Sequence, residues 1–318
     1  MTIVDKIIEK IKNSNKIAIC GHINSDGDSI GSCLALSNAL YVMGKNPIVY
    51  LDGTEIKYDS AKGREFISNE TNIDLFISVD TAALDRLSHH KELFEKSETI
   101  VIDHHISNNG YGNLNWIDEE ASSTCEMLAF LIAKLVKIDM TIAAWLYTGI
   151  STDTSVFSNP NTTPKTLRVS ADLIETGIDY STISFLWNKS RTYNSFKSIG
   201  KLKERAIFVE DLGLVYTSVT LDYMKKHEIE ERDIESMSTL LNTIEEAKIA
   251  ISVRESEKNV TRASFRSRSR NIDVSKIAGH FKGGGHINAS GCTIEAPPHE
   301  AIEQIIRHLR ELKICKVF

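Results

Sequence analysis

Cysteine is scarce in this chain of 318 residues, and the cysteines that it has are not grouped. Their number is odd, and no two follow the C-x-x-C spacing of zinc and redox sites. They are Cys20, Cys33, Cys125, Cys292 and Cys315. This pattern excludes a disulfide framework and indicates a reduced, cytoplasmic protein.

A long hydrophobic run and an excess of positive charge are also missing. The most apolar stretch, residues 127–138, is interrupted by Lys134 and is too short to span a bilayer. The N-terminus predicts an amphipathic helix and not a signal peptide, so no membrane association is expected. Acidic residues outnumber Lys and Arg by 43 to 37, and the net charge of -6 excludes a uniform nucleic-acid coat.

The remaining composition, 42% hydrophobic and 25% charged, is typical of a globular protein, and the length suits two domains. Apolar runs rich in β-branched residues predict four strands in the first half, at residues 16–20, 47–51, 75–79 and 99–102. Helical periodicity predicts helices at residues 29–43, 122–136 and 140–150, and another that begins at Thr163-Pro164 and ends at Gly177. Strands that alternate with helices indicate an α/β fold with a parallel sheet and helices on both faces.

The pattern changes from about residue 208. Strands are predicted at residues 214–219, 248–253 and 260–265, the last two paired, with helices at 231–242 and 302–312. A polar helical stretch before them has little apolar stripe and is interpreted as a linker helix. The sequence therefore predicts a larger domain at residues 1–190, a linker at 191–206 and a smaller α/β domain at 207–318.

Asp103, His104 and His105 directly follow the fourth predicted strand. Neighbouring residues of an extended segment point to opposite sides, so this triplet can serve a metal ion and a substrate phosphate together. A second pair, His89-His90, follows no strand and is interpreted as a solvated helix face. Ligands gather beyond the carboxyl ends of parallel strands, which makes the triplet the stronger candidate.

A larger set of carboxylates and histidines is predicted at strand ends or turns. It comprises His22, Asp26, Asp28, Asp80, Asp103, His104, His105 and Asp153. One metal ion cannot use so many ligands, and the set suits two divalent ions that activate a water and clamp a phosphoryl group. Imidazole with carboxylate and no thiolate favours Mn²⁺, Fe²⁺, Co²⁺ or Zn²⁺ over Mg²⁺, with Mn²⁺ as first choice. Alone, Asp26-Gly27-Asp28 is typical of a turn and Asp80 of a helix cap; their joint occurrence indicates a metal centre.

The second block contains a basic strand and a glycine run. Alternate residues of the predicted strand share one face: Arg262, Ser264 and Arg266. This face suits a phosphodiester backbone, whereas Phe265 points toward the core. Gly283-Gly284-Gly285 precedes His286 and is predicted to let backbone amides approach an anion. A solvated surface for the basic residues and a flexible loop or bulge for the glycines are the alternatives.

Together these motifs resemble those of the DHH/DHHA1 family of phosphoesterases. The motifs are His22-x-x-x-Asp26-Gly27-Asp28, Asp80, Asp103-His104-His105, Asp153 and Gly283-Gly284-Gly285-His286. The chain departs from the family at Ser25, where proline is usual. The resemblance implies a catalytic DHH domain and a smaller DHHA1 domain, with the active site in the cleft between them.

The resemblance also implies a role for each residue. One metal would be held by His22, Asp26 and a bridging Asp80, and the other by Asp28, Asp80, His104 and Asp153. The catalytic residues would be His105, which contacts the scissile phosphate, Asp103, which orients its neighbours, and Asp80. Substrate would be bound by Arg262, Gly283, Gly284, Gly285, His286 and Ser290.

Within the family, the resemblance is strongest to enzymes that hydrolyse very short oligoribonucleotides to mononucleotides. It implies the same activity here, together with hydrolysis of 3′-phosphoadenosine 5′-phosphate to AMP and phosphate, by attack of a metal-activated hydroxide. A phosphodiesterase for linear or cyclic dinucleotides is the alternative enzyme, and a non-catalytic RNA-binding module is the alternative of another class. Short RNAs and small nucleotides are the expected partners, and a homodimer is left open.

Overall fold

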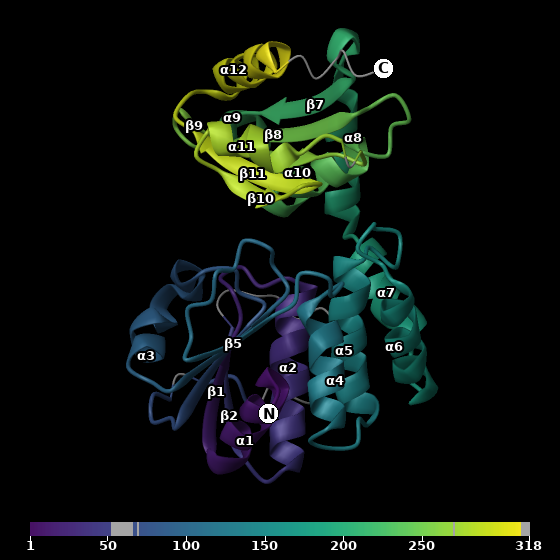
Figure 1. The fold of residues 1–318 in the computed structure, drawn as a ribbon. Coiled ribbons are helices and arrows are strands. Elements are labelled where there is room, and N and C mark those ends of the chain that lie inside the picture. The colour runs from purple at the N-terminus through teal and green to yellow at the C-terminus, as the bar shows by residue number, and fades with distance from the viewer. Residues whose placement is uncertain (52–65, 69, 270, 313–318) are drawn as a thin grey trace. The chain divides into compact units, whose positions relative to one another are not determined.

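The computed structural model describes residues 1–51, 66–68, 70–269 and 271–312. The chain divides into two compact units, Met1–Ser190 and Arg191–Phe318 (Figure 1). Each unit has its own sheet and its own hydrophobic core. The predicted architecture, a parallel α/β domain followed by a smaller α/β domain, is confirmed.

The first unit is built on a five-stranded parallel sheet. Its strands are β1 (Lys16–Cys20), β2 (Asn46–Tyr50), β3 (Leu75–Val79), β4 (Thr99–Asp103) and β5 (Leu114–Ile117), in the order β2-β1-β3-β4-β5. All residues of β3 and β4 are buried, as expected for parallel strands that are covered on both faces. The four predicted strands are confirmed to within one residue, and β5 is an additional, half-buried edge strand.

Helices cover both faces of this sheet. One face packs against α1 (Ile3–Asn13), α2 (Gly27–Val42), α4 (Thr124–Ala133) and α5 (Met140–Asp153), and Figure 1 shows the last three side by side. The other face is covered by η2 (Leu84–His90) and α3 (Lys91–Glu95) through Leu87 and Phe94. The unit is completed by α6 (Pro164–Glu175), α7 (Tyr180–Ser184) and a π-helical turn (Phe185–Lys189). Thr163 caps α6 and Pro164 is its first residue, as predicted.

Helix α2 is buried from Gly27 to Leu40, because it lies between the sheet and α5. The two helices approach closely where each carries a glycine. A Cβ atom on Gly31 would lie 2.5 Å from the carbonyl oxygen of Trp145, and a Cβ atom on Gly149 would collide with the carboxylate of Asp28. Glycine at these two positions therefore lets the helix pair form around Asp28.

The second unit contains a six-stranded sheet. Its strands are β6 (Ile207–Val209), β7 (Leu214–Val219), β8 (Ile249–Glu257), β9 (Val260–Arg266), β10 (Gly284–His286) and β11 (Ala289–Ile294), in the order β10-β11-β9-β8-β7-β6. Only β7 and β8 pair in parallel among these strands, and the predicted pairing of β8 with β9 is confirmed. One face packs against α8 (Tyr193–Glu204), α9 (Leu221–His227) and α10 (Glu231–Leu241), and the other against α11 (Val274–His280) and α12 (Pro298–Glu311).

Two helical stretches differ from their predictions. Helix α8 was expected to have little apolar stripe, but it buries Leu202 and packs against α10 within the second unit. His90 was expected to be solvated, but its ring stacks on Tyr50 with 4.1 Å between the centroids, while His89 is exposed. Both differences arise because packing partners distant in the sequence cover surfaces that look polar in the sequence.

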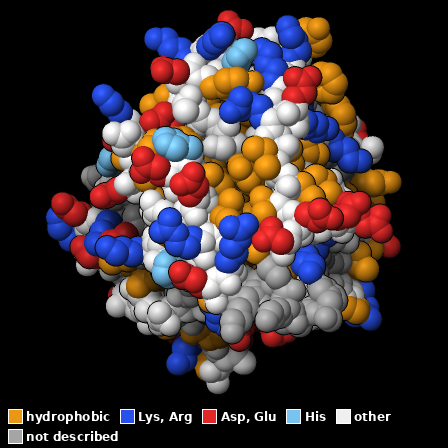
Figure 2. Space-filling model, turned by 90° about the horizontal axis from the view of Figure 1, so that it is seen from above, with side chains coloured by type: hydrophobic (Ala, Val, Ile, Leu, Met, Phe, Trp, Pro, Cys, Tyr) orange, Lys and Arg blue, Asp and Glu red, His pale blue; other side chains and the backbone are white. Residues whose placement is uncertain are grey.

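The surface of the chain mixes both signs of charge. On the face shown in Figure 2, Lys and Arg side chains are interspersed with Asp and Glu, and hydrophobic side chains gather among them. This face carries no uniform positive charge, in agreement with the composition. Across the described residues, no helix has the length and apolarity needed to cross a membrane.

Candidate metal centre

The predicted metal ligands lie at the carboxyl ends of three neighbouring strands. His22 follows β1, Asp80 directly follows β3, and Asp103 ends β4. The strand order changes direction between β1 and β3, and open parallel sheets bind ligands at such a switch point. Asp26 and Asp28 join them from the start of α2, where Asp26 is the N-cap.

Asp153 does not lie in a turn as predicted but is the last residue of α5, which extends beyond residue 150. A left-handed turn follows, with φ angles of 47°, 54° and 64° at Ser155, Val156 and Phe157. Such a turn costs about 1–2 kcal/mol per residue, and the Val156 N–H stabilises it by donating to the Ser151 carbonyl at 2.7 Å. Backbone strain of this kind clusters at functional sites, and here it ends the helix directly after the ligand.

Three groups of side chains bring their ligand atoms within 4.8 Å of one another. The groups are His22, Asp26 and Asp80; Asp28, His104 and Asp153; and Asp80, His104 and His105. Asp80 and His104 each belong to two groups, so the three form one connected cluster. The structure thus brings together all six predicted metal ligands.

Both histidine ligands point the same ring atom into this cluster. Nδ1 of His22 lies 2.9 Å from the carbonyl oxygen of Ile23, and Nδ1 of His104 lies 3.3 Å from that of Ala121. A carbonyl only accepts hydrogen bonds, so Nδ1 donates in each of these contacts, and Nε2 is the ring atom that would bind a metal ion once it has lost its proton. The two Nε2 atoms face the carboxylates of the cluster at 3.2 to 3.8 Å. This is the ring orientation that metal binding requires.

The carboxylates of the cluster are crowded, and those of Asp28 and Asp80 are shielded from water. Asp28 and Asp80 are each 1% exposed, and burial together with neighbouring carboxylates raises the pKa of Asp28, Asp80 and Asp153. Burial would lower the pKa of His22, but its hydrogen bond with Asp26 and the charge of Asp80 raise it to about 9. Divalent cations would relieve this excess of negative charge, so the donor set fits a metal centre.

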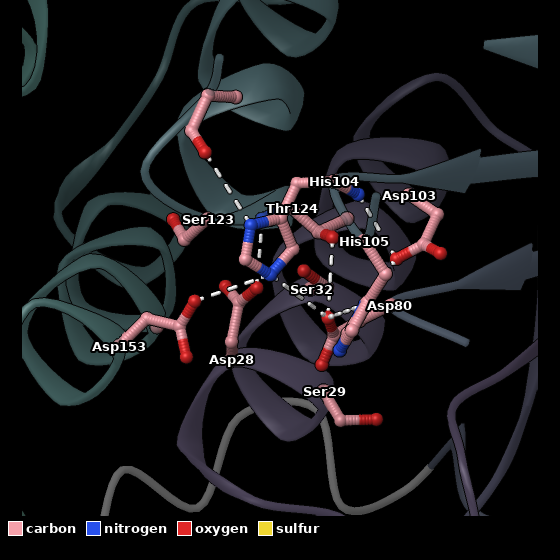
Figure 3. Close-up of polar contacts among 12 residues, drawn as sticks. Asp28, Ser29, Ser32, Asp80, Asp103, His104, His105, Ser123, Thr124 and Asp153 are labelled. Carbon is pink, nitrogen blue, oxygen red and sulfur yellow. Dashed lines mark hydrogen bonds and ion pairs between the residues drawn. The ribbon is translucent and has the colours of Figure 1, made fainter. Parts of the chain in front are cut away.

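The N-terminus of α4 holds the carboxylate of Asp28. The backbone N–H of Thr124 donates to one of its oxygens at 2.7 Å (Figure 3). The backbone N–H of Cys125 donates to the other at 3.0 Å. The hydroxyl of Thr124 also donates to Asp80 Oδ1 at 3.3 Å. Sequence reasoning missed this support because backbone amides leave no mark on the sequence, and the helix cap Ser123 is its only signal.

Asp103 orients His105. Its Oδ1 lies 2.7 Å from Nδ1 of His105, and its Oδ2 accepts a hydrogen bond from Asn108 at 2.7 Å. Burial would raise the pKa of Asp103, but these hydrogen bonds lower it. Because a carboxylate accepts, Nδ1 of His105 carries a proton and Nε2 is the ring atom left for other contacts. His105 is 23% exposed, more than the 10% of His22 and of His104.

In the second unit, the residues of β9 alternate as predicted. Phe265 is buried, Arg262 is exposed, and Ser264 and Arg266 are half-buried. A small hollow beside this strand is lined by Ile234, Glu235, Ser252, Arg254, Arg262 and Ser264. Arg254 pairs there with Glu231 and Glu235 at 2.7 and 3.1 Å, whereas Arg262 has no carboxylate partner among the described residues.

The glycine run forms an edge strand in place of the expected loop. Gly284–His286 is β10, which pairs antiparallel with β11. A Cβ atom on Gly283 would collide with the backbone of Gly291, and one on Gly285, at a φ of 140°, would lie 2.5 Å from the carbonyl oxygen of Ala289. A Cβ atom on Gly284 would meet nothing within 4 Å. Two of the glycines are therefore needed for strand packing, and Gly284 alone is open.

Ser290, predicted to bind substrate, also makes a contact inside the second unit. It is 7% exposed, and its hydroxyl donates to the carbonyl oxygen of Val274 at 2.6 Å. The hydrogen bond ties β11 to α11. His286 lies at the end of β10 and is half-buried.

Comparison with known proteins places this geometry in a family. The model described as "DHH family, N-terminal domain" matches residues 16–150, and the model described as "DHHA1 domain" matches residues 211–313. The uncharacterized protein MG371 of Mycoplasma genitalium is 30% identical over 302 residues, which cover 90% of this chain and 89% of that protein. The chain belongs to the DHH family. The first match contains five of the six predicted metal ligands, and the second contains β9 and the glycine strand.

Two further relatives extend the comparison of this DHH-family chain. A Thermus thermophilus protein named bifunctional oligoribonuclease and PAP phosphatase NrnA is 29% identical over 316 residues, which cover 98% of this chain and 94% of that protein. An exopolyphosphatase-related protein from Bacteroides fragilis has a solved structure that matches with a TM-score of 0.88 at 22% identity, covering 98% of this chain and 96% of that one. The structural match shows the shared fold.

Gly149→Ala in the DHH unit tests how tightly the helices enclose Asp28. The added methyl group would collide with Asp28 and with Cys125, so we expect the free energy of unfolding to fall by about 1–3 kcal/mol. The control is Gly200→Ala on α8, where a Cβ atom meets nothing within 4 Å and the helix gains up to about 1 kcal/mol. Urea denaturation of both variants measures the difference. Equal stability of the two variants would contradict close packing at Gly149.

Glycine substitutions in the DHHA1 unit separate strand packing from ligand binding. We expect Gly285→Ala to lower the free energy of unfolding by about 1–3 kcal/mol, because the methyl group meets β11 at a left-handed backbone position. Gly284→Ala should leave stability within about 0.5 kcal/mol of the wild type, since the site is open. Thermal denaturation checks both, and a stable Gly285→Ala variant would contradict the packing role.

Proposed function

We propose that this chain is a metal-dependent phosphoesterase that hydrolyses very short oligoribonucleotides to mononucleotides. The observation that carries the proposal is the cluster of three imidazoles and four carboxylates at the switch point of a parallel sheet. The imidazoles of His22 and His104 present Nε2 to the carboxylates, as metal ligands do. A second substrate, 3′-phosphoadenosine 5′-phosphate, is part of the proposal because of the activities named for the Thermus thermophilus relative.

The donor set supports two divalent ions, with Mn²⁺ as first choice. His22, Asp26 and Asp80 would hold one ion, and Asp28, Asp80, His104 and Asp153 would hold the other. Mixed imidazole and carboxylate donors suit Mn²⁺, and no thiolate lies among the grouped ligands of the described residues. When bound, such ions activate water and neutralise charge on a phosphoryl group.

The chain's own residues would orient the substrate at this centre. Asp103 fixes the ring of His105 by accepting from Nδ1, which leaves Nε2 to contact a phosphoryl oxygen and to hold or give a proton there. Asn108 and the backbone N–H of His104 complete the hydrogen bonds of Asp103, so the carboxylate cannot turn away. The catalytic residues of the proposal are therefore His105, Asp103 and Asp80.

The side chains of β9 and β10 in the second unit support a role in binding an anionic part of the substrate. Arg262 is exposed and lacks a carboxylate partner within the described ranges, which leaves its charge available for a phosphate. Arg266 and His286 lie in one row across the sheet, separated by the small side chain of Ala289. Donors placed in this way, together with the open Gly284, suit an anionic ligand.

The cysteines support a cytoplasmic site of action. Four cysteines are buried and form no disulfide, as in proteins of a reducing compartment: Cys20, Cys33, Cys125 and Cys292. Cys315 lies outside the described residues. A homodimer also stays part of the proposal, and analytical ultracentrifugation tests it.

Hydrolysis of a 5′-labelled RNA ladder of two to several nucleotides tests the proposed function. We expect Mn²⁺-dependent release of mononucleotides, fastest for the shortest RNAs and lost on chelation, and phosphate release from 3′-phosphoadenosine 5′-phosphate. Turnover of linear or cyclic dinucleotides alone would favour a dinucleotide phosphodiesterase. RNA binding without turnover in the presence of Mn²⁺ would favour a non-catalytic RNA-binding module and overturn the proposal.

A further inference from the structure

Arg86 contacts His22, a predicted ligand of the metal cluster, at ring atom Nδ1, whereas Nε2 of the same ring faces the carboxylates. Arg86 belongs to η2, six residues after Asp80, and its carbonyl oxygen accepts a hydrogen bond from the backbone N–H of Ile23 at 2.9 Å. Its Nη2 atom lies 3.1 Å from Nδ1 of His22. The backbone contact therefore fixes the Cα atom of Arg86 close to His22.

The contact with His22 does not satisfy the guanidinium. Nδ1 of His22 already faces the carbonyl oxygen of Ile23 at 2.9 Å, and it carries the proton when Nε2 serves as a ligand. A guanidinium has donors and no acceptor, so it cannot form a hydrogen bond with a protonated Nδ1. In the metal-binding tautomer, Arg86 is thus a cation that contacts the ring of His22 without a hydrogen bond to it.

No other group in the described part of the chain takes up this charge. Apart from the contact with His22, the Arg86 side chain makes no hydrogen bond there, and none of the ion pairs among these residues includes it. The adjacent carboxylate of Asp85 pairs with Lys91 at 2.5 Å and not with Arg86. The residue is exposed, so its guanidinium is accessible to a ligand.

We propose that Arg86 binds a non-bridging oxygen of the substrate phosphate at the metal centre. The planar guanidinium matches the geometry of phosphate oxygens, and its hydrogen bonds to a charged acceptor are among the stronger ones. This inference rests on the proposed phosphoesterase function and adds a substrate ligand that none of the motifs in the sequence contains. Arg86 is proposed to raise the affinity for phosphate and to leave the affinity for the metal ions unchanged.

Two other roles for Arg86 predict different behaviour. If the side chain only positions the ring of His22, its loss weakens metal binding. If it is only a solvated surface residue, its loss changes neither metal nor phosphate affinity. Phosphate binding and metal binding must therefore be measured separately.

The experiment compares Arg86→Ala, Arg86→Lys and the wild type, with Arg168→Ala on the exposed face of α6 as the matched control. Calorimetry gives the dissociation constant for Mn²⁺ on metal-free protein and then for inorganic phosphate on the Mn²⁺-loaded protein. For Arg86→Ala we expect phosphate affinity to fall about tenfold to a hundredfold, with Mn²⁺ affinity within about twofold of the wild type. Arg86→Lys should recover part of the loss, because lysine restores the charge but not the planar fork.

Unchanged phosphate affinity in Arg86→Ala would overturn the proposal, and so would weakened Mn²⁺ binding without any effect on phosphate. Failure of the wild type to bind phosphate would overturn it as well. With a dinucleotide RNA as substrate, KM of Arg86→Ala should rise by a similar factor. If the wild type binds phosphate through Arg86 but hydrolyses no RNA or bisphosphate, the proposed substrates fail while the phosphate ligand stands.

Discussion

Asp80→Asn is expected to abolish hydrolysis and to raise the melting temperature of the metal-free protein. Asp80 belongs to two of the three ligand groups, so its loss removes donor atoms from both proposed ions. A metal ion supplies several kcal/mol of charge stabilisation in the transition state, so we expect kcat to fall about a thousandfold or more. Activity in Mn²⁺ measures this effect.

The expected rise in melting temperature follows from the burial of Asp80. Asp80 is 1% exposed, and burial and the charges of Asp28 and Asp26 raise its pKa well above the usual value. A neutral amide of the same shape removes this repulsion in the absence of metal, and asparagine tolerates the left-handed φ of 51° at this position. We therefore expect the metal-free melting temperature to rise by a few degrees.

The matched control for this variant is Asp172→Asn, which changes an exposed carboxylate of α6. It should leave both kcat and the melting temperature close to those of the wild type. Substitutions at exposed sites usually change the free energy of unfolding by less than about 0.5 kcal/mol. Retained hydrolysis in Asp80→Asn would contradict the assignment of Asp80 as a shared ligand. A lower melting temperature of the metal-free variant would contradict the repulsion among the buried carboxylates.

Metal removal is expected to reverse the pH dependence of stability. In the folded state, the pKa values of three carboxyl groups are raised: those of Asp28, Asp80 and Asp153. At a pH above the ordinary carboxyl pKa of about 4, the folded chain therefore binds more protons than the unfolded chain. The contribution of these carboxyl groups to stability therefore falls as the pH rises. His22, with its pKa raised to about 9, acts in the same direction, since its stabilisation is complete below its usual pKa and is lost as the pH rises through 9.

Mn²⁺ should produce the opposite slope. Metal ions bind deprotonated carboxylates and neutral imidazole, so their affinity and the stability that they add increase with pH. The side chain of Asp26 is exposed, and its hydrogen bond with His22 lowers its pKa to about 2, so the stability that it adds is lost only in strong acid. Thermal denaturation between pH 5 and 8, with chelator and with Mn²⁺, measures both slopes. Parallel curves would contradict metal binding by these carboxylates.

The strands of the DHH unit could be predicted because buried parallel strands require continuous apolar runs. Lys16–Cys20 and Leu75–Val79 have this pattern, and their predicted bounds agree with the structure. Edge strands lack it. β5 is half-buried along Leu114–Ile117, and β10 consists of two glycines and a histidine, so neither has an apolar run to mark it. Their positions depend on pairing with β4 and β11.

Five of the six predicted metal ligands could be recognised in the sequence because each follows a strand or begins a helix. Asp153 differs, since α5 ends in a left-handed turn of Ser155, Val156 and Phe157, and no glycine marks that turn. The groups that hold the ligands could not be predicted at all. The backbone amide of Thr124 contacts Asp28, which is 96 residues away in the sequence, and Arg86 contacts His22, which is 64 residues away. Both contacts therefore depend on how the helices pack.

The most direct measurement is the turnover of a labelled dinucleotide RNA against the number of Mn²⁺ ions bound per chain, in one titration of metal-free protein. The cluster of His22, Asp26, Asp28, Asp80, His104 and Asp153 predicts two bound ions per chain, turnover that grows as the second ion binds, and loss of turnover on chelation. Full turnover by metal-free protein would contradict a metal-dependent phosphoesterase. So would two bound ions without hydrolysis of short RNA or of 3′-phosphoadenosine 5′-phosphate.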